Sequence, residues 1–486
     1  MSRAVFLRSL VPISAVVLLV SCVGAPDLGP KPEPRAAGSF ATERSFATEG
    51  DAAWPTEGWW RGYGDEQLSR LIEEGLAGSP DVAAALARIR RAEGLAQAAG
   101  AALLPTLDAT GAAGVRKQSY NMGFPSEFVP RGWLDEGRVG LEAGFDIDLW
   151  GRNRAGLAAA ISEARAARLD ARQAQLLLAT AIGAAYADLA RLYAERDVLG
   201  AAVELRSSTG KLVSDRVLNG LDTRAELRQA EAGIPRARAD LEAVDESIGL
   251  TRNRLAALLG SGPDRGLAIE RPELAKLQPH GLPAGVSTDL LARRPDIAAA
   301  RARTEAAANR IKVARADFYP SIRLSALIGY QSVGLDNLAK QGSLAGNAGP
   351  ALSLPLFRGG ALKGQYRGAR AAYDEAVADY DRVVTDAYRE VADTVTSRRS
   401  LGEQLAQSRQ ALAASEDAYS IARKRYQGGL STFLDVLTAE ERLLDARRSF
   451  AALSARAFAL DIALIRALGG GFTTDQAITP KEERHG

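Results

Sequence analysis

Cysteine and histidine are nearly absent from this sequence of 486 residues, which contains one cysteine and two histidines. A single cysteine excludes an internal disulfide. The histidines, His280 in a proline-rich linker and His485 near the C-terminus, provide neither a histidine-based metal site nor a Ser-His-Asp arrangement. Neighbouring acids such as Glu440 and Glu441 are typical of a solvated helix face rather than of a general acid and base. We therefore predict no catalytic residue, no metal site and no cofactor.

The sequence also lacks an excess of charge of one sign. Lys and Arg number 61 and Asp and Glu 59, so the formal net charge is +2 and nothing favours nucleic acid as a partner. Near the N-terminus, Arg3 and Arg8 precede an apolar run from Leu10 to Val20 that is too short to span a bilayer. This pattern is typical of a secretory signal peptide, which we assign to residues 1–21.

The one cysteine, Cys22, directly follows the apolar run. The stretch from Leu19 to Cys22 resembles the lipobox of bacterial lipoproteins, in which the chain is cut before the cysteine and the cysteine is acylated. Several acyl chains give a firm membrane anchor. The resemblance, with Val23 rather than Asp in the next position, implies the outer membrane. The alternative is a small residue near an ordinary cleavage site.

Prolines follow the cysteine closely. Pro26, Pro30, Pro32 and Pro34 make the next segment a stiff, extended chain that cannot contribute to a core. We assign residues 22–60 to a lipidated, proline-rich N-terminal tether.

The rest of the chain contains an internal repeat. The segment from Arg216 to Ala232 returns from Arg425 to Glu441, and the pairs Leu259-Gly260 and Leu468-Gly469 recur at the same offset. Each half is predicted to run helix, strand, loop, strand, very long helix, turn, helix. Chance similarity between Ala-rich helices is the alternative, and the shared order argues against it. The predicted boundaries are 61–265 for the first repeat, 266–285 for a linker, 286–471 for the second repeat and 472–486 for a C-terminal tail.

Four segments alternate apolar and polar residues, as strands with one dry and one wet face do. Their apolar rows are Leu107, Ala109, Ala113 and Val115; the alternate residues of GLEAGFDIDLW from Gly140 to Trp150; Ile322, Leu324, Ala326, Ile328 and Tyr330; and Leu352, Leu354 and Leu356. The loops are predicted from Lys117 to Glu136 and from Ser332 to Ala348. A soluble sandwich has the same period, so alternation alone does not establish a membrane barrel.

Proline-free stretches decide between these architectures. No proline occurs between Arg152 and Asn219. About 65 helical residues at roughly 1.5 Å each form a rod near 100 Å long. No compact domain contains such a rod, although a coiled-coil stalk does. Four strands in a bilayer leave two edges whose unpaired groups each cost several kcal/mol. Two chains give eight strands and a filled barrel, whereas three give twelve strands and a lumen.

We therefore predict a mixed α+β membrane protein. Three chains with four strands each form a twelve-stranded outer-membrane β-barrel, which is continued by a long periplasmic α-helical barrel.

Several short motifs resemble the outer membrane efflux protein family of the TolC type, and within it the lipoprotein branch of tripartite RND drug efflux systems. The motifs are Leu290–Ile297 (LLARRPDI), Phe318-Tyr319-Pro320, Leu356–Gly360, and Arg425-Tyr426 followed by Gly429-Leu430. The resemblance extends from Trp54 to Gly470. It implies a homotrimer in contact with outer-membrane lipid, a closed periplasmic end, and a periplasmic adaptor that links the channel to an inner-membrane RND-type pump.

The resemblance also implies roles for two turns. Gly220 and Leu221 in the first half, and Gly429 and Leu430 in the second, match the periplasmic tips that contact the adaptor. The alternative, compatible with this role, is that the glycines simply end helices.

Leu434 matches the apolar residue of the periplasmic aperture, where three copies meet on the axis. A plain core leucine is the alternative. Relatives carry Asp and Arg where this chain has Thr438 and Glu441, so an ionic lock at the aperture is in doubt.

The sequence thus favours a passive conduit for drugs or other small molecules. The alternatives are a conduit for protein secretion, a structural periplasmic lipoprotein that uses its long helices as a spacer, and an enzyme. The four alternating strands favour a conduit over a spacer, and the residue inventory argues against an enzyme. The sequence does not identify the substrate.

Overall fold

The computed structural model describes residues 24–36, 39–42, 44–46, 52–121, 125, 127–273, 283 and 286–473. The signal peptide, Cys22, both histidines and most of the predicted C-terminal tail lie outside these residues. The chain divides into two compact units. The first comprises 1–34, 89–167 and 300–380, and the second comprises 35–88, 168–299 and 381–486.

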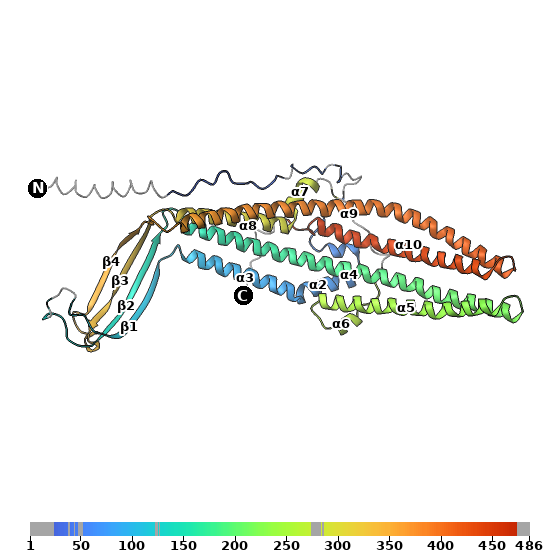
Figure 1. Ribbon diagram of the computed structural model, residues 1–486, viewed down its shortest axis with the longest axis horizontal. Coiled ribbons are helices and arrows are strands. Elements are labelled where there is room, and N and C mark those ends of the chain that lie inside the picture. The colour runs from blue at the N-terminus through green and yellow to red at the C-terminus, as the bar shows by residue number, and fades with distance from the viewer. Residues whose placement is uncertain are drawn as a thin grey trace. The chain divides into compact units, whose positions relative to one another are not determined.

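The first unit contains one antiparallel sheet in the order β1-β2-β3-β4 (Figure 1). The strands are β1 (Thr106–Arg116), β2 (Leu134–Ile147), β3 (Ser321–Val333) and β4 (Leu344–Ser353). Within the described residues, β1 and β4 pair on one side only. This sheet therefore has two open edges, as four strands from one chain in a bilayer are expected to have.

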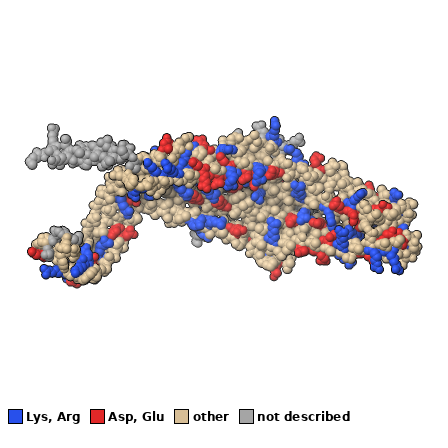
Figure 2. Space-filling view, in the orientation of Figure 1, with Lys and Arg blue, Asp and Glu red and all other residues tan. Residues whose placement is uncertain are grey.

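The strand register brings the apolar rows onto one face of the sheet. Ala109 lies opposite Leu141, Leu141 opposite Ile328, and Ile328 opposite Gly346. Ile328 is 58% exposed and Leu107 69% exposed, so water reaches this face in the isolated chain. The other face is polar. Seen from the side drawn in Figure 2, most of the sheet surface carries few charged side chains. An uncovered apolar face opposite a polar one is the pattern of a barrel wall between lipid and lumen.

Two sequence predictions about the loops are wrong. The first loop covers only 117–133, because β2 begins at Leu134. The second covers only 334–343, because β4 begins at Leu344, and Leu354 and Leu356 lie beyond its end. The sequence of β4, LAGNAGPALS, is rich in glycine, asparagine and proline, which are typical of turns and therefore predict a loop there. The segment nevertheless forms a strand, because it pairs with β3 along its whole length, from Leu344 opposite Tyr330 to Ser353 opposite Ser321.

The helices confirm the internal repeat by their lengths. They are α3 (Pro80–Ala101) and α8 (Pro295–Ala316) with 22 residues each, α4 (Arg152–Leu218) and α9 (Ala361–Gln427) with 67 each, and α5 (Arg224–Leu258) and α10 (Phe433–Ala467) with 35 each. The 67-residue helices are about 100 Å long at 1.5 Å per residue, as the proline-free stretches predict.

Shorter elements are also found among the described residues. They are η3 (Trp59–Tyr63), α2 (Glu66–Gly78), α6 (Asp264–Leu267), α7 (Val286–Arg293) and η5 (Leu335–Asn337). The main core of the second unit forms where α2 and η3 pack on α4, α5 and α10. Its largest fully buried side chains include Tyr186, Leu68, Ile182 and Leu255.

The Arg-Arg-Pro-Asp motif lies in this second unit. The Arg294 guanidinium is 5% exposed and pairs with Asp296 at 2.6 Å and with Glu390 at 2.8 Å. It also donates to the backbone oxygen of Ala467 at 3.1 Å. The motif thus joins the start of α8 to α9 and to the end of α10, and its role is structural.

Candidate functional site

Two helical hairpins, α4–α5 and α9–α10, each reverse through a short turn (Figure 1). Gly220 has φ 69° and Gly429 has φ 72°, in the left-handed region that glycine adopts without strain. The next amide closes each turn: Leu221 N bonds Arg216 O at 2.9 Å, and Leu430 N bonds Arg425 O at 2.8 Å. Nothing lies within 4 Å of a Cβ built on either glycine, so backbone conformation rather than crowding requires glycine here.

The helices that leave the turns, α5 and α10, each begin with a capping box. Thr223 N donates to Glu226 Oε2 at 2.6 Å, and Thr432 N donates to Asp435 Oδ2 at 2.9 Å. The backbone and hydroxyl hydrogen bonds from Thr432 lower the pKa of Asp435. The sequence carries a signal for these capping boxes, because a threonine followed three residues later by an acid is typical of a helix start. Both turns are thus fixed in shape.

The two turns expose leucines. Leu221 is 63% exposed and Leu430 is 71% exposed, although each lies in a turn of defined geometry. Exposed apolar side chains on a rigid turn offer a contact surface to another protein.

Leu434, Thr438 and Glu441 form an exposed stripe along α10. Leu434 is 62% exposed, whereas its neighbours Phe433 and Val436 are buried. A plain core leucine is therefore the wrong interpretation for the chain as described. The Thr438 hydroxyl donates to Leu434 O at 2.8 Å on its own helix, and Glu441 has no ion pair among the described residues. Within one chain, the stripe offers an apolar residue but no ionic lock.

Glu440 corrects a sequence prediction. Its side chain is 1% exposed, so it does not lie on a solvated helix face, although Glu441 does. The carboxylate accepts from Arg206 Nε at 3.3 Å and from the Thr209 hydroxyl at 3.3 Å, both on α4. Burial raises the pKa of Glu440, and Arg206 opposes that rise. Helical spacing explains the burial, because Glu440 follows Val436 by four residues on the face that packs inward.

A second contact between the hairpins was not predicted. Arg216 Nε pairs with Asp222 Oδ2 at 2.9 Å, and Arg216 Nη1 donates to the backbone oxygen of Tyr426 at 2.9 Å. The Tyr426 hydroxyl donates to the same Asp222 carboxylate, and the Arg216 guanidinium lies 4.5 Å from the Tyr426 ring centre. Tyr426 is 1% exposed, and burial raises its pKa. The first hairpin is thus tied to the second beside the turns.

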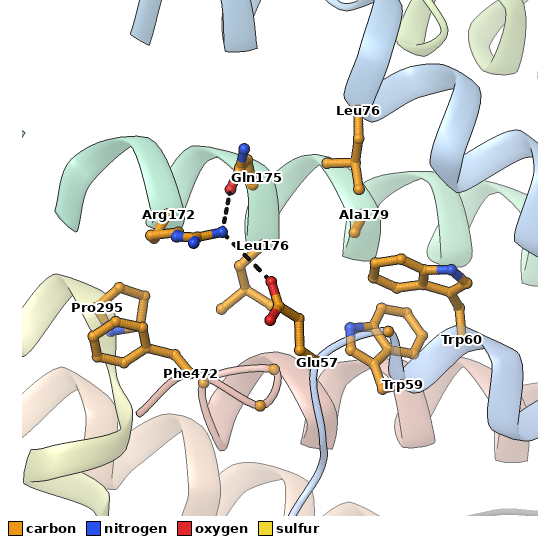
Figure 3. Close-up of a pocket in the computed structure, with 14 residues that line it drawn as sticks. Glu57, Trp59, Trp60, Leu76, Arg172, Gln175, Leu176, Ala179, Pro295 and Phe472 are labelled. Carbon is orange, nitrogen blue, oxygen red and sulfur yellow. Dashed lines mark hydrogen bonds and ion pairs between the residues drawn. The ribbon is translucent and has the colours of Figure 1, made fainter. Parts of the chain in front are cut away.

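The second unit also contains a pocket of about 100 Å³ (Figure 3). Trp59 and Trp60 line one side, and Arg172 reaches Glu57 at 3.5 Å and Gln175 at 3.4 Å. Small-molecule sites usually measure about 300–1,000 Å³, so this pocket is small for a substrate. Among the residues that the structure describes, no group of three or more His, Cys, Asp and Glu could hold a metal ion.

Together, these features define a class of protein. A sheet with a lipid-type face, a polar face and two open edges is joined in one chain to two helices of 67 residues and two rigid helical hairpins. This is the protomer of an outer-membrane channel in which several chains complete the barrel.

The sequence pattern of the outer membrane efflux protein family matches residues 71–261 and 286–470, and the chain belongs to that family. It is 38% identical over 331 residues to the fusaric acid resistance protein FusA of Burkholderia cepacia, covering 67% of this chain and 62% of that relative. It is 32% identical over 437 residues to the multidrug resistance outer membrane protein MdtP of Escherichia coli K12, covering 88% of this chain and 89% of MdtP.

The crystal structure of the outer membrane protein VceC from Vibrio cholerae has the same fold. The TM-score is 0.80 at 46% identity, covering 86% of this chain and 100% of VceC.

These relationships confirm the predicted fold and function. The chain is a protomer of a trimeric, twelve-stranded outer-membrane barrel continued by a helical barrel, and it is the outer-membrane channel component of a tripartite efflux system. Members of the family are channels, which favours a conduit over a structural spacer and over an enzyme.

Proposed function

We propose that the channel is a passive conduit closed at its periplasmic end by apolar contacts of Leu434. The observation that carries this proposal is the stripe on α10, where an exposed leucine is followed at helical spacing by Thr438 and Glu441. Three copies of Leu434 around the axis bring apolar side chains together, whereas Thr438 and Glu441 provide no opposite charges. Closure at this stripe therefore depends little on ion pairs.

The partners act at the turns. Gly220 and Gly429 fix the turn geometry, and Leu221 and Leu430 are the exposed apolar groups that a periplasmic adaptor contacts. The adaptor joins the channel to an inner-membrane RND-type pump, which supplies the energy and selects the drug or other small molecule. No residue of this chain has a catalytic role in that process.

The N-terminus adds a membrane anchor. Residues 1–21 are removed, and Cys22 carries acyl chains that hold the tether in the outer membrane. Several acyl chains on one residue provide the second signal that stable anchoring needs.

Single-channel conductance in planar bilayers tests the closure. Leu434→Ser should raise the conductance of the closed trimer, because a hydroxyl lets water enter the constriction and removes apolar contact. Leu221→Ser is the matched control, since it alters an exposed leucine of a turn outside the stripe, and it should leave conductance unchanged while weakening adaptor capture. Low conductance in the Leu434→Ser trimer, with its mass confirmed by light scattering, would contradict closure at this residue.

A further inference from the structure

An open hollow of about 540 Å³ lies between the start of α4 and the end of α8, next to the ends of β2 and β3. Two aromatic rings form one wall: Trp150 and Tyr319 stack with ring centres 4.7 Å apart, and Trp150 Nε1 donates to Pro320 O at 2.7 Å. Three cations line the rest, namely Arg154 on α4 with Lys312 and Arg315 on α8. The function described above uses none of these residues.

The charge of the hollow is only partly balanced. Arg154 pairs with Asp148 at 3.3 Å. Lys312 Nζ donates to the amide oxygen of Asn309 at 2.9 Å, which carries no charge. Within the described part of the chain, neither Lys312 nor Arg315 has an ion-pair partner. Two positive charges therefore remain available to an anion.

The depth of the hollow matches a membrane interface. The last row of the apolar face is Ile147, Ile322 and Leu352, which lie opposite one another in the sheet. Trp150 and Tyr319 lie within three residues of that row, and Trp150 is 51% exposed. Tryptophan and tyrosine favour the level of the lipid headgroups, where one end of the ring is apolar and the other is wet.

The hollow opens on the outer side of the helical layer. On α8, Ala307 and Ile311 face Tyr373 on α9, and Lys312 lies about a third of a turn around the helix from them. Helical geometry then places the hollow on the side of the layer where the segment Gly24–Pro34 packs. There, Arg370 on α9 donates to Gly29 O at 3.2 Å, and the Tyr373 hydroxyl donates to Pro32 O at 3.1 Å. A segment that leads to a lipid anchor runs outside the channel, so this step rests on the proposed anchor at Cys22.

Other subunits do not cover the hollow. The helix α4 follows β2 and α8 precedes β3, and these are the inner strands of the sheet. The neighbouring chains join at β1 and β4, the open edges. The hollow therefore lies in the middle of the wall contributed by one chain, away from both seams.

We propose that this hollow binds the phosphodiester headgroup of an anionic phospholipid in the periplasmic leaflet of the outer membrane. Lys312 and Arg315 bind the phosphate oxygens, Arg154 lies at the edge of the site, and the Trp150–Tyr319 stack packs along the glycerol and the first acyl carbons. Two unpaired cations suit a phosphodiester with net negative charge, whereas a zwitterionic headgroup adds a positive charge that they repel.

Native mass spectrometry of the purified trimer tests this site. The trimer is titrated with dioleoylphosphatidylglycerol or with dioleoylphosphatidylcholine, and we expect one tightly held phosphatidylglycerol per protomer. The double variant Lys312→Ala and Arg315→Ala should weaken that binding by about tenfold or more, because each basic residue near an anionic lipid surface contributes measurably. The double variant Lys211→Ala and Arg236→Ala, which removes two exposed charges from α4 and α5, is the charge-matched control and should bind as the native trimer does.

Three outcomes would overturn the proposal. They are equal binding of the two lipids by the native trimer, unchanged phosphatidylglycerol binding by the Lys312 and Arg315 variant, and complete displacement of the lipid by millimolar inorganic phosphate, which would indicate a site for small anions. The conductance of the same variants is measured in planar bilayers, so that failure of the lipid site can be distinguished from failure of the proposed conduit. A trimer that conducts normally but shows no lipid preference refutes the headgroup site alone.

Discussion

Removal of the Tyr426 hydroxyl should loosen the two helical hairpins without disturbing the packing around the ring. That hydroxyl donates to the Asp222 carboxylate, to which Arg216 also donates at 2.9 Å. Phenylalanine keeps the ring, its contact with Phe433 at 6.0 Å between centres, and the stacking under Arg216. Tyr426→Phe therefore deletes one hydrogen bond between the α9–α10 and α4–α5 hairpins.

The size of the effect follows from what remains in the variant. A hydrogen bond to a charged group contributes about 1.5–3 kcal/mol. Because Arg216 still pairs with Asp222, the carboxylate is not left unpaired, and the lower value of about 1.5 kcal/mol applies. The hydrogen bond from Tyr426 to Asp222 breaks when the two hairpins of a chain separate. Its removal should therefore raise the population of chains with separated hairpins by about tenfold.

The open probability of single channels in planar bilayers measures this change. Tyr419→Phe is the matched control, because Tyr419 lies two turns earlier on α9, is also buried, and does not contact Asp222. We expect a higher open probability for Tyr426→Phe and the native value for Tyr419→Phe. An unchanged open probability in a correctly assembled Tyr426→Phe trimer, or an equal rise in the control, would refute the idea that this contact resists opening.

Two further predictions concern a buried acid and the anchor. Burial raises the pKa of Glu440 above its ordinary value of 4.5, so the folded chain holds this proton more tightly than the unfolded chain, and the stability from this group falls as pH rises through the folded-state pKa. The thermal midpoint of Glu440→Gln relative to the native protein should therefore increase above about pH 4.5; a difference that is constant with pH would contradict this assignment. Cys22→Ser should abolish incorporation of labelled palmitate into the mature chain, and retained label would refute lipidation at Cys22.

Periodicity within one segment predicted most of the fold. The signals were local: the apolar rows of β1, β2 and β3, and the proline-free runs of α4 and α9. In each of them, the spacing of apolar residues within a short window indicates which side chains share a face. The open edges and the cost of unpaired backbone in lipid then led to three chains, which the family confirms. β4 was placed incorrectly because glycine, asparagine and proline removed its alternation.

Contacts between distant segments could not be predicted in this way. The acceptors of Arg206 include Glu440, 234 residues away, and nothing in the sequence around either residue indicates the pairing. Glu440 looked solvated because Glu441 follows it, yet the inward face of α10 includes one acid and not the other. The Trp150–Tyr319 wall likewise joins residues from two halves of the repeat, although each residue stands next to a recognisable strand.

Two contacts between the hairpins bear on the proposed closure at Leu434, because the α10 stripe itself lacks opposite charges. Arg206 donates to the Glu440 carboxylate on α10 at 3.3 Å and to the backbone oxygen of Gly233 on α5 at 3.1 Å. Arg216 and Asp222 hold α9 through Tyr426 beside the turns. Each chain therefore holds its own hairpins together at two half-buried arginines, while Leu434 stays exposed on the protomer. Under the proposed closure at Leu434, contacts inside each chain, rather than opposite charges on the α10 stripe, hold the hairpins together. Under the proposed closure, opening the channel requires the two hairpins of each chain to separate as well as the three Leu434 side chains to part.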